Sequence, residues 1–226
     1  MSGAEPRRFA DRAEAGRALG ERLKAMQLHR PVIYALPRGG VPVAAEIASA
    51  LAAPLDLVLV RKMGAPSQPE LAIGAVVGGD TPETVLNPEI VAITGASESY
   101  IEAVRKRELA EIERRRHLYL PGRTLPSPAG RDAVVVDDGL ATGATARAAL
   151  HALRRRGPSR VILAVPVAPP DVLAAMRDEA DEIVCVQEAW NFRGVSAFYL
   201  DFHQLTDEEV INLLKSTDAS EDGDPD

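Results

Sequence analysis

The stretch from Ala133 to Thr145, which reads AVVVDDGLATGAT, constrains the fold of this chain more than any other. Its three consecutive valines predict a short strand buried on both faces. Two adjacent carboxylates, Asp137 and Asp138, follow where that strand would leave the sheet. A loop of small residues then leads into a predicted helix. Such a loop turns several backbone N–H groups toward one anion, and the helix dipole favours negative charge there.

A phosphate pocket beside two carboxylates suits a ligand with both a phosphate and a polyol, because carboxylates accept hydrogen bonds from vicinal hydroxyls. A phosphorylated sugar is such a ligand, and Thr142 and Thr145 offer additional hydroxyl donors. The plainer alternative is an ordinary βα turn with a solvated acidic pair. Against it, adjacent Asp side chains at the end of a buried strand repel each other unless something binds them.

The same stretch resembles the signature of type I phosphoribosyltransferases for phosphoribosyl pyrophosphate (PRPP): a hydrophobic run, two acidic residues and a Thr-Gly-x-Thr loop. The resemblance implies that Asp137 and Asp138 hold the ribose hydroxyls, act in catalysis and bind Mg²⁺, directly or through water. It also implies a loop for the 5-phosphate, made of Ala141, Thr142, Gly143, Ala144 and Thr145. Many purine enzymes carry a third Asp at the position of Ala141, so hypoxanthine-type base chemistry is not implied.

A second strand, glycine loop and helix come earlier in the chain. A buried strand is predicted over 32–36 and a helix over 41–52, with Arg38, Gly39 and Gly40 between them. This stretch resembles the pyrophosphate loop of the family. The resemblance implies that the loop N–H groups and the Arg38 side chain bind the diphosphate of PRPP. The alternative is a plain turn with a solvated arginine.

Arg61 and Lys62 follow a third apolar run, 55–60, which predicts another buried strand. The pair matches an Arg-Lys pair of adenine- and orotate-type members, which implies a catalytic role in neutralising the diphosphate. The alternative is a solvated strand edge. Residues 64–70 are predicted to form a mobile loop that closes over the reacting centre. Closure would exclude water, which hydrolyses an activated ribosyl group.

The pattern then changes to short β-type runs over 72–77, 84–86 and 90–93, which predict a small antiparallel excursion. A long charged helix is predicted from Ser97 or Ser99 to about His117. Its basic residues between 105 and 116 indicate a solvated face with i,i+4 ion pairs. The alternative is that some of these cations reach a diphosphate, either in the same chain or in a neighbouring subunit.

Alternation of β and α elements along the chain predicts an α/β fold: an open parallel sheet with helices on both faces. A first amphipathic helix is predicted over 7–27, with Asp11 as an early cap. We expect one phosphoribosyltransferase domain over 1–215, with a C-terminal hood at about 187–205. Residues 216–226 are acidic and poor in apolar residues, which predicts a disordered tail.

The hood segment gathers aromatic residues in a chain that is only 4% aromatic. By family resemblance, Trp190 and Phe192 line the acceptor pocket, where their rings would stack on a flat heterocycle. The alternative for each is core packing.

The composition of the chain limits which partners it can bind and in which compartment it is expected. A formal net charge of −7 argues against nucleic acid and membrane surfaces as partners. No apolar run reaches the length of a membrane span. The single cysteine, Cys185, excludes an internal disulfide and fits a reducing cytoplasm.

The resemblance extends from about Phe9 to Leu214 and includes an uncharacterised subgroup of predicted phosphoribosyltransferases, whose acceptor family membership does not define. It implies Mg²⁺-dependent transfer of a 5-phosphoribosyl group from PRPP to a nitrogenous base or other acceptor, with release of pyrophosphate. It also implies a homo-oligomer, most simply a dimer. Two alternatives stay open: a regulatory protein that binds PRPP or a nucleotide without catalysis, and a hydrolase or phosphorylase of a related sugar phosphate.

Overall fold

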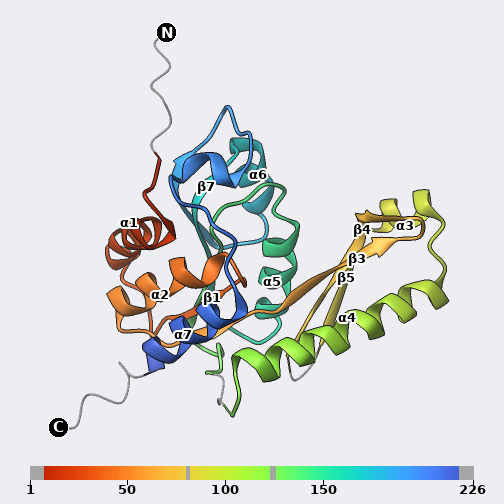
Figure 1. Ribbon diagram of the computed structural model, residues 1–226, viewed down its shortest axis with the longest axis horizontal. Coiled ribbons are helices and arrows are strands. Elements are labelled where there is room, and N and C mark those ends of the chain that lie inside the picture. The colour runs from red at the N-terminus through yellow and green to blue at the C-terminus, as the bar shows by residue number, and fades with distance from the viewer. Residues whose placement is uncertain (1–7, 80–81, 123–125, 219–226) are drawn as a thin grey trace.

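A five-stranded parallel sheet forms the centre of the protein, whose computed structural model describes residues 8–79, 82–122 and 126–218 (Figure 1). Every neighbouring pair in this sheet is parallel, so the predicted open parallel sheet is confirmed. The strands, in spatial order, are β2 (Leu55–Leu57), β1 (Val32–Ala35), β6 (Asp132–Val136), β7 (Arg160–Ala168) and β8 (Glu182–Glu188).

Helices cover both faces of this sheet, as the continuous apolar strands require. In β6, Val134 and Val136 pack into the core that includes α1 and α2, while Ala133 and Val135 pack into the core that includes α5. The first face carries α1 (Arg12–Lys24), α2 (Gly40–Leu51) and α7 (Asp207–Asp218). The second face carries α5 (Ala144–Arg154) and α6 (Pro170–Met176).

A smaller antiparallel sheet, in the order β3–β4–β5, forms an arm that extends away from the parallel sheet (Figure 1). It consists of β3 (Val60–Ala65), β4 (Gln68–Val77) and β5 (Glu83–Leu86), with α3 (Pro88–Thr94) and the long α4 (Glu98–Tyr119). The predicted strand over 55–60 is therefore wrong as a single element. The chain leaves the parallel sheet after Leu57, and Val60 already pairs with Val77 in the arm.

Two further local predictions in the arm are also wrong. The mobile loop expected over 64–70 is a hairpin, in which Ser67 at φ 63° forms part of the turn between β3 and β4. The strand expected over 90–93 lies within α3. The Asn87 side chain accepts a hydrogen bond from the Ile90 N–H (3.3 Å), and Pro88 occupies the first turn, which are signals for a helix start.

Helix α1 begins at Arg12 and so is shorter than the helix predicted over 7–27, while Asp11 caps it as predicted: the Asp11 side chain accepts a hydrogen bond from the Glu14 N–H (2.7 Å). Near its other end, Arg22 donates to the carbonyls of Cys185 (2.5 Å) and Val186 (3.1 Å) in β8. These carbonyls lie beside Pro166 of β7, where the β7–β8 register passes from Val165–Cys185 to Val167–Gln187. Proline has no N–H to donate to a neighbouring strand, and Arg22 supplies donors at this level.

The C-terminal segment begins after β8 and contains a short 3₁₀ helix, η1 (Val195–Phe198), before α7. Helix α7 continues to Asp218, so residues 216–218 are helical where the tail was predicted to start. The rest of that predicted tail, 219–226, lies outside the described residues, as does residue 7 of the first predicted helix. Within the described parts of the chain, none of the helices has the length and apolar character needed to cross a membrane.

Candidate functional site

The acidic pair lies where β6 ends, at the carboxyl edge of the parallel sheet. Asp137 and Asp138 are both half-buried, and the Asp138 N–H donates to Asp137 Oδ1 (2.9 Å). Burial, with a further contribution from the Asp138 charge, raises the pKa of Asp137 well above its ordinary value. Burial also raises the pKa of Asp138, while a hydrogen bond from Arg12 opposes the rise. The free site therefore disfavours two ionised carboxylates side by side, and positive charge or hydrogen-bond donors from a ligand would stabilise that ionised pair.

The predicted phosphate loop leads from this pair into α5. Gly143 is the N-cap residue of α5, and its left-handed conformation (φ 72°) disfavours residues other than glycine. Since glycine has no side chain, no side-chain hydrogen bond caps the helix. The N–H groups of the first turn of α5 thus have no capping side chain at the position that an anion would take. Ala141, Thr142 and Ala144 are exposed and Thr145 is half-buried, so the loop surface is accessible.

The earlier glycine loop lies directly against the acidic pair. A Cβ on Gly39 would overlap the Asp138 carboxylate at Oδ2, and a Cβ on Gly40 would lie 2.5 Å from the Val136 carbonyl oxygen. Glycine is therefore required at both positions by close approach. The peptide bond between Pro37 and Arg38 is cis. The structure thus brings the Arg38–Gly40 loop against the acidic pair from which the 141–145 loop begins.

Arg38 extends from this loop toward the start of α7. Its Nη1 lies 3.7 Å from Asp207 Oδ1, and the side chain is 35% exposed. The Tyr119 hydroxyl, at the end of α4, donates to the same Asp207 oxygen. Arg38 is thus close to the site but is paired with a carboxylate of the C-terminal helix.

Two side chains that sequence reasoning missed contact Asp138. Arg12 Nε donates to Asp138 Oδ2 (2.9 Å), and the Tyr199 hydroxyl donates to the Asp138 carbonyl (2.7 Å). The Arg12 guanidinium also donates to the His203 carbonyl (3.1 Å) and lies 3.9 Å from the centroid of the Phe202 ring. In the sequence, Arg12 looks like any charge at the start of an amphipathic helix. No local pattern links it to a residue 126 positions away.

A cavity of about 440 Å³ lies between the start of α1, the hood segment and α7, and Arg12 is part of its lining. Its polar lining includes Asp11, Arg12, Asp201, His203 and Glu209. Neither predicted acceptor residue is part of that lining.

Trp190 and Phe192 have different environments. Trp190 is 84% exposed, whereas Phe192 stacks on Phe198 with ring centroids 5.7 Å apart. Phe192 is half-buried with one ring neighbour, and Trp190 presents an exposed aromatic surface in the hood, so for both residues the role in an acceptor pocket stays a prediction.

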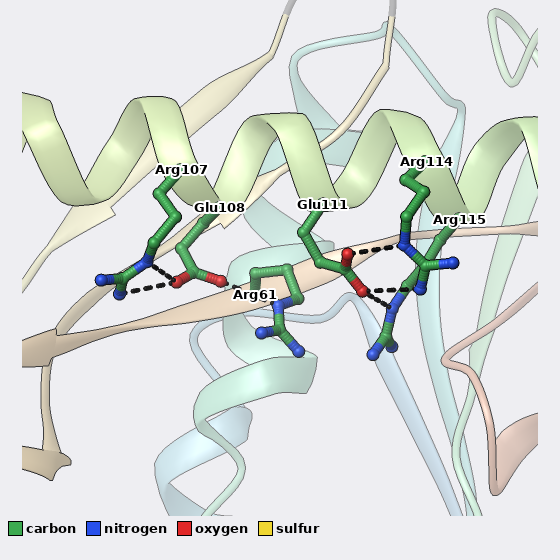
Figure 2. A network of polar contacts seen from close by, with 6 residues as sticks. All are labelled: Arg61, Arg107, Glu108, Glu111, Arg114 and Arg115. Carbon is green, nitrogen blue, oxygen red and sulfur yellow. Dashed lines mark hydrogen bonds and ion pairs between the residues drawn. The ribbon is translucent and has the colours of Figure 1, made fainter.

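The other predicted cations lie in the arm. Arg61 Nε donates to Glu108 Oε2 (2.9 Å), and Arg107 donates to Glu108 Oε1 (Figure 2). Lys62, the next residue in β3, is exposed. Farther along α4, Arg114 and Arg115 both bind Glu111, so the ion pairs expected for the basic helix are present. Arg61 is thus engaged by α4 in this structure.

The donor set for a metal is small. The part of the chain that the structure describes contains no group of three or more His, Cys, Asp or Glu side chains arranged to hold a metal ion. The site itself offers two carboxylates, of which Asp138 is already bonded to Arg12. Mg²⁺ is commonly held by one or two carboxylates together with substrate phosphates and water. Asp137 and Asp138 fit that pattern.

The fold is that of an α/β protein in which one glycine loop lies against an acidic pair at the carboxyl edge of a parallel sheet and a second loop leads from that pair into a helix. Residues 10–203 match the family model of the phosphoribosyl transferase domain. The chain therefore belongs to the phosphoribosyl transferase family, a family of transferase enzymes, and the resemblance noted in the sequence is confirmed.

Individual relatives agree with this assignment. The crystal structure of TT1426 from Thermus thermophilus has a TM-score of 0.81 and 44% identity, and the match covers 92% of this chain and 98% of that one. The putative phosphoribosyl transferases MT0597 and Rv0571c, from two strains of Mycobacterium tuberculosis, are each 45% identical over 206 residues. Those matches cover 91% of this chain and 46% of the relatives, so the chain spans about half their length.

Proposed function

We propose that this protein transfers the 5-phosphoribosyl group of PRPP to a nitrogen atom of an acceptor and releases pyrophosphate. The observation that carries the proposal is the contact between the acidic pair and the diphosphate loop, in which Gly39 lies against Asp138. This contact supports one ligand that spans both loops, with its 5-phosphate at residues 141–145 and its diphosphate at residues 38–40. PRPP has these two charged ends on one ribose.

The chemistry assigned to each group follows from charge. The bond between the anomeric carbon and the diphosphate oxygen breaks, and a bond from that carbon to the acceptor nitrogen forms. Asp137 and Asp138 would accept hydrogen bonds from the ribose hydroxyls and stabilise positive charge on the ring. Arg38, the N–H groups of the loop, and the Arg61–Lys62 pair would stabilise the departing diphosphate. The acceptor proton leaves to solvent or to the diphosphate, and we assign no protein base.

We propose Mg²⁺ as the metal for this site. The raised pKa values of both carboxylates and their small number support a divalent cation that completes its ligand set with substrate oxygens and water. When bound, Mg²⁺ would neutralise the diphosphate and so favour its departure. Asp137 and Asp138 would hold it directly or through water.

A direct test incubates the protein with PRPP, Mg²⁺ and a panel of purine, pyrimidine and other nitrogen heterocycles, and follows products by mass spectrometry and pyrophosphate by a coupled assay. A new mass equal to acceptor plus ribosyl phosphate is the expected result. The double variant Asp137→Asn with Asp138→Asn should give none, while the exposed control Asp178→Asn should behave as wild type.

Other outcomes distinguish the alternatives. PRPP that binds but stays intact with the whole panel would favour a regulatory PRPP-binding protein. Ribose 5-phosphate formed without an acceptor would favour a hydrolase. Absence of PRPP binding would overturn the proposal.

We further propose that the protein works as a homodimer in the cytoplasm. The dimer rests on family resemblance and the compartment on the single cysteine. Light scattering of the purified protein and fractionation of the source cells test these two statements.

A further inference from the structure

The Arg12 guanidinium is held on several sides near the site. The residue is 8% exposed, and its side chain contacts three groups from two parts of the chain: Asp138 after β6, and Phe202 and His203 in the hood segment. Nε donates to Asp138 Oδ2 (2.9 Å), Nη1 donates to the His203 carbonyl (3.1 Å), and the guanidinium lies 3.9 Å from the Phe202 ring centroid. A planar guanidinium restrained in this way has little rotational freedom.

The carboxylate oxygen that Arg12 binds is the one that faces the diphosphate loop. Oδ2 of Asp138 is the atom that a Cβ on Gly39 would overlap most closely. Rotation of the Asp138 carboxylate toward the loop is therefore limited by Gly39, and rotation away from it would break the bond to Arg12. The Tyr199 hydroxyl fixes the backbone of the same residue (2.7 Å to the Asp138 carbonyl).

We propose that Arg12 is a positioning residue of the site, which orients the Asp138 carboxylate for the ribose of PRPP. This inference rests on the proposed function, since it deepens the ribose-binding role of Asp138. Arg12 acts through Asp138 and has no assigned contact with substrate. Arg12 also lines the cavity of about 440 Å³, whose lining residues do not include Asp138.

The test is a double-mutant cycle with Arg12→Met and Asp138→Asn, read by calorimetric titration with PRPP and with pyrophosphate. Arg12→Met alone should weaken PRPP binding by about 10- to 100-fold, the range expected for loss of a charge-assisted hydrogen bond. In the Asp138→Asn background the same change should have little further effect, because Arg12 acts through that carboxylate. Pyrophosphate is titrated without Mg²⁺, so that its binding depends on the diphosphate loop and not on a metal held by Asp138. Because it also lacks the ribose, its affinity should stay the same. Arg12→Lys should recover part of the lost PRPP affinity.

Arg17→Met is the matched control, because Arg17 lies on the same helix, forms an ion pair with Glu46 and has a side chain that is 59% exposed. It should leave both affinities unchanged. Equal losses for PRPP and pyrophosphate in Arg12→Met, or independent effects in the two backgrounds, would mean a general structural role and would overturn the inference.

A ligand-free measurement separates this inference from the proposed function. The same cycle is measured by urea unfolding. Independent effects there would show that Arg12 and Asp138 are not coupled, and would overturn the inference whatever PRPP does. The urea cycle could instead show that the effects of the two substitutions are coupled while the wild-type protein does not bind PRPP. That result would overturn the proposed function, and with it the role of Arg12 in positioning a carboxylate for the ribose.

Discussion

The Asp138 carboxylate lies so close to Gly39 that any side chain at residue 39 would overlap its Oδ2 atom. The backbone at Gly39 is itself ordinary (φ −59°), so an alanine there would be free of backbone strain. The need for glycine at this position therefore comes from the neighbouring carboxylate. An alanine at residue 39 therefore tests the effect of close approach to Asp138 without any effect of an unfavourable backbone conformation.

Gly39→Ala should displace the Asp138 carboxylate and break its bond to Arg12. We expect PRPP affinity to fall by about tenfold or more, since a charge-assisted hydrogen bond of the site is lost. Titration calorimetry with PRPP measures this. The control is Gly95→Ala, where a Cβ meets nothing within 4 Å but φ is 62°. That variant should lose about 1 kcal/mol of stability and keep its affinity. Unchanged PRPP binding in Gly39→Ala would contradict the expectation.

Arg61 and Arg107 share Glu108, whose side chain is 7% exposed, and so form a matched pair for mutation. Each change to Gln leaves the carboxylate with one fewer partner, so both should lower the free energy of unfolding by roughly 1 kcal/mol, as urea titration would show. If Arg61 also neutralises the diphosphate, Arg61→Gln alone should reduce kcat/KM for PRPP by about tenfold or more. If the two variants changed kcat/KM equally, Arg61 would have only a structural role, through its contact with α4.

Asp137→Asn should make the protein more stable at neutral pH while abolishing PRPP use. Because the folded state raises the pKa of Asp137, it binds this proton more tightly than the unfolded chain does. The resulting stabilisation is present below the unfolded pKa of about 3.9 and is lost as pH rises through the folded pKa. The Asn variant removes that loss, so its Tm advantage should be present at pH 8 and shrink toward pH 4. Each kcal/mol corresponds to on the order of 2–4 °C. A lower Tm at pH 8 would show that the ionised carboxylate stabilises the free protein.

Trp190 and Phe192 should respond differently to alanine. Phe192→Ala removes the ring stacked on Phe198 and should cost about 1–3 kcal/mol in urea unfolding. Trp190→Ala removes an exposed ring and should change stability by less than about 0.5 kcal/mol. If Trp190 stacks on the acceptor, the KM for the acceptor found in the panel should rise by about tenfold. A KM unchanged by Trp190→Ala would remove this residue from the acceptor pocket.

The parallel sheet and both glycine loops could be predicted because their signals are local. Val134, Val135 and Val136 form a buried run, and the carboxylates and small residues follow within a few positions. The split between Leu57 and Val60 could not be predicted, since one apolar run serves two sheets without a polar break. The sequence does signal the start of α3, through Asn87 and Pro88. The apolar residues 90–93 that follow favoured a strand instead, and the prediction followed them.

The surroundings of the acidic pair depend on tertiary contacts that no periodicity encodes. Tyr199 contacts the Asp138 carbonyl across 61 positions, and Arg61 finds Glu108 across 47. The sequence marked Tyr199 only as an aromatic in the hood, and it marked Arg61 as a cation for the diphosphate without any sign of its contact with Glu108. Whether a charged side chain meets a ligand or a neighbouring helix is decided by the packing of the elements that carry it.

The bond from Arg22 to the carbonyls beside Pro166 gives α1 a second anchor, ten residues after Arg12. One end of the helix is bonded to the acidic pair, and the other is bonded to the last strand of the sheet. The arginine that meets Asp138 is thus held in place by contacts within the protein itself. A ligand for this site must then fit a charge pattern that is already in place, which favours selection by shape over adaptation of the pocket.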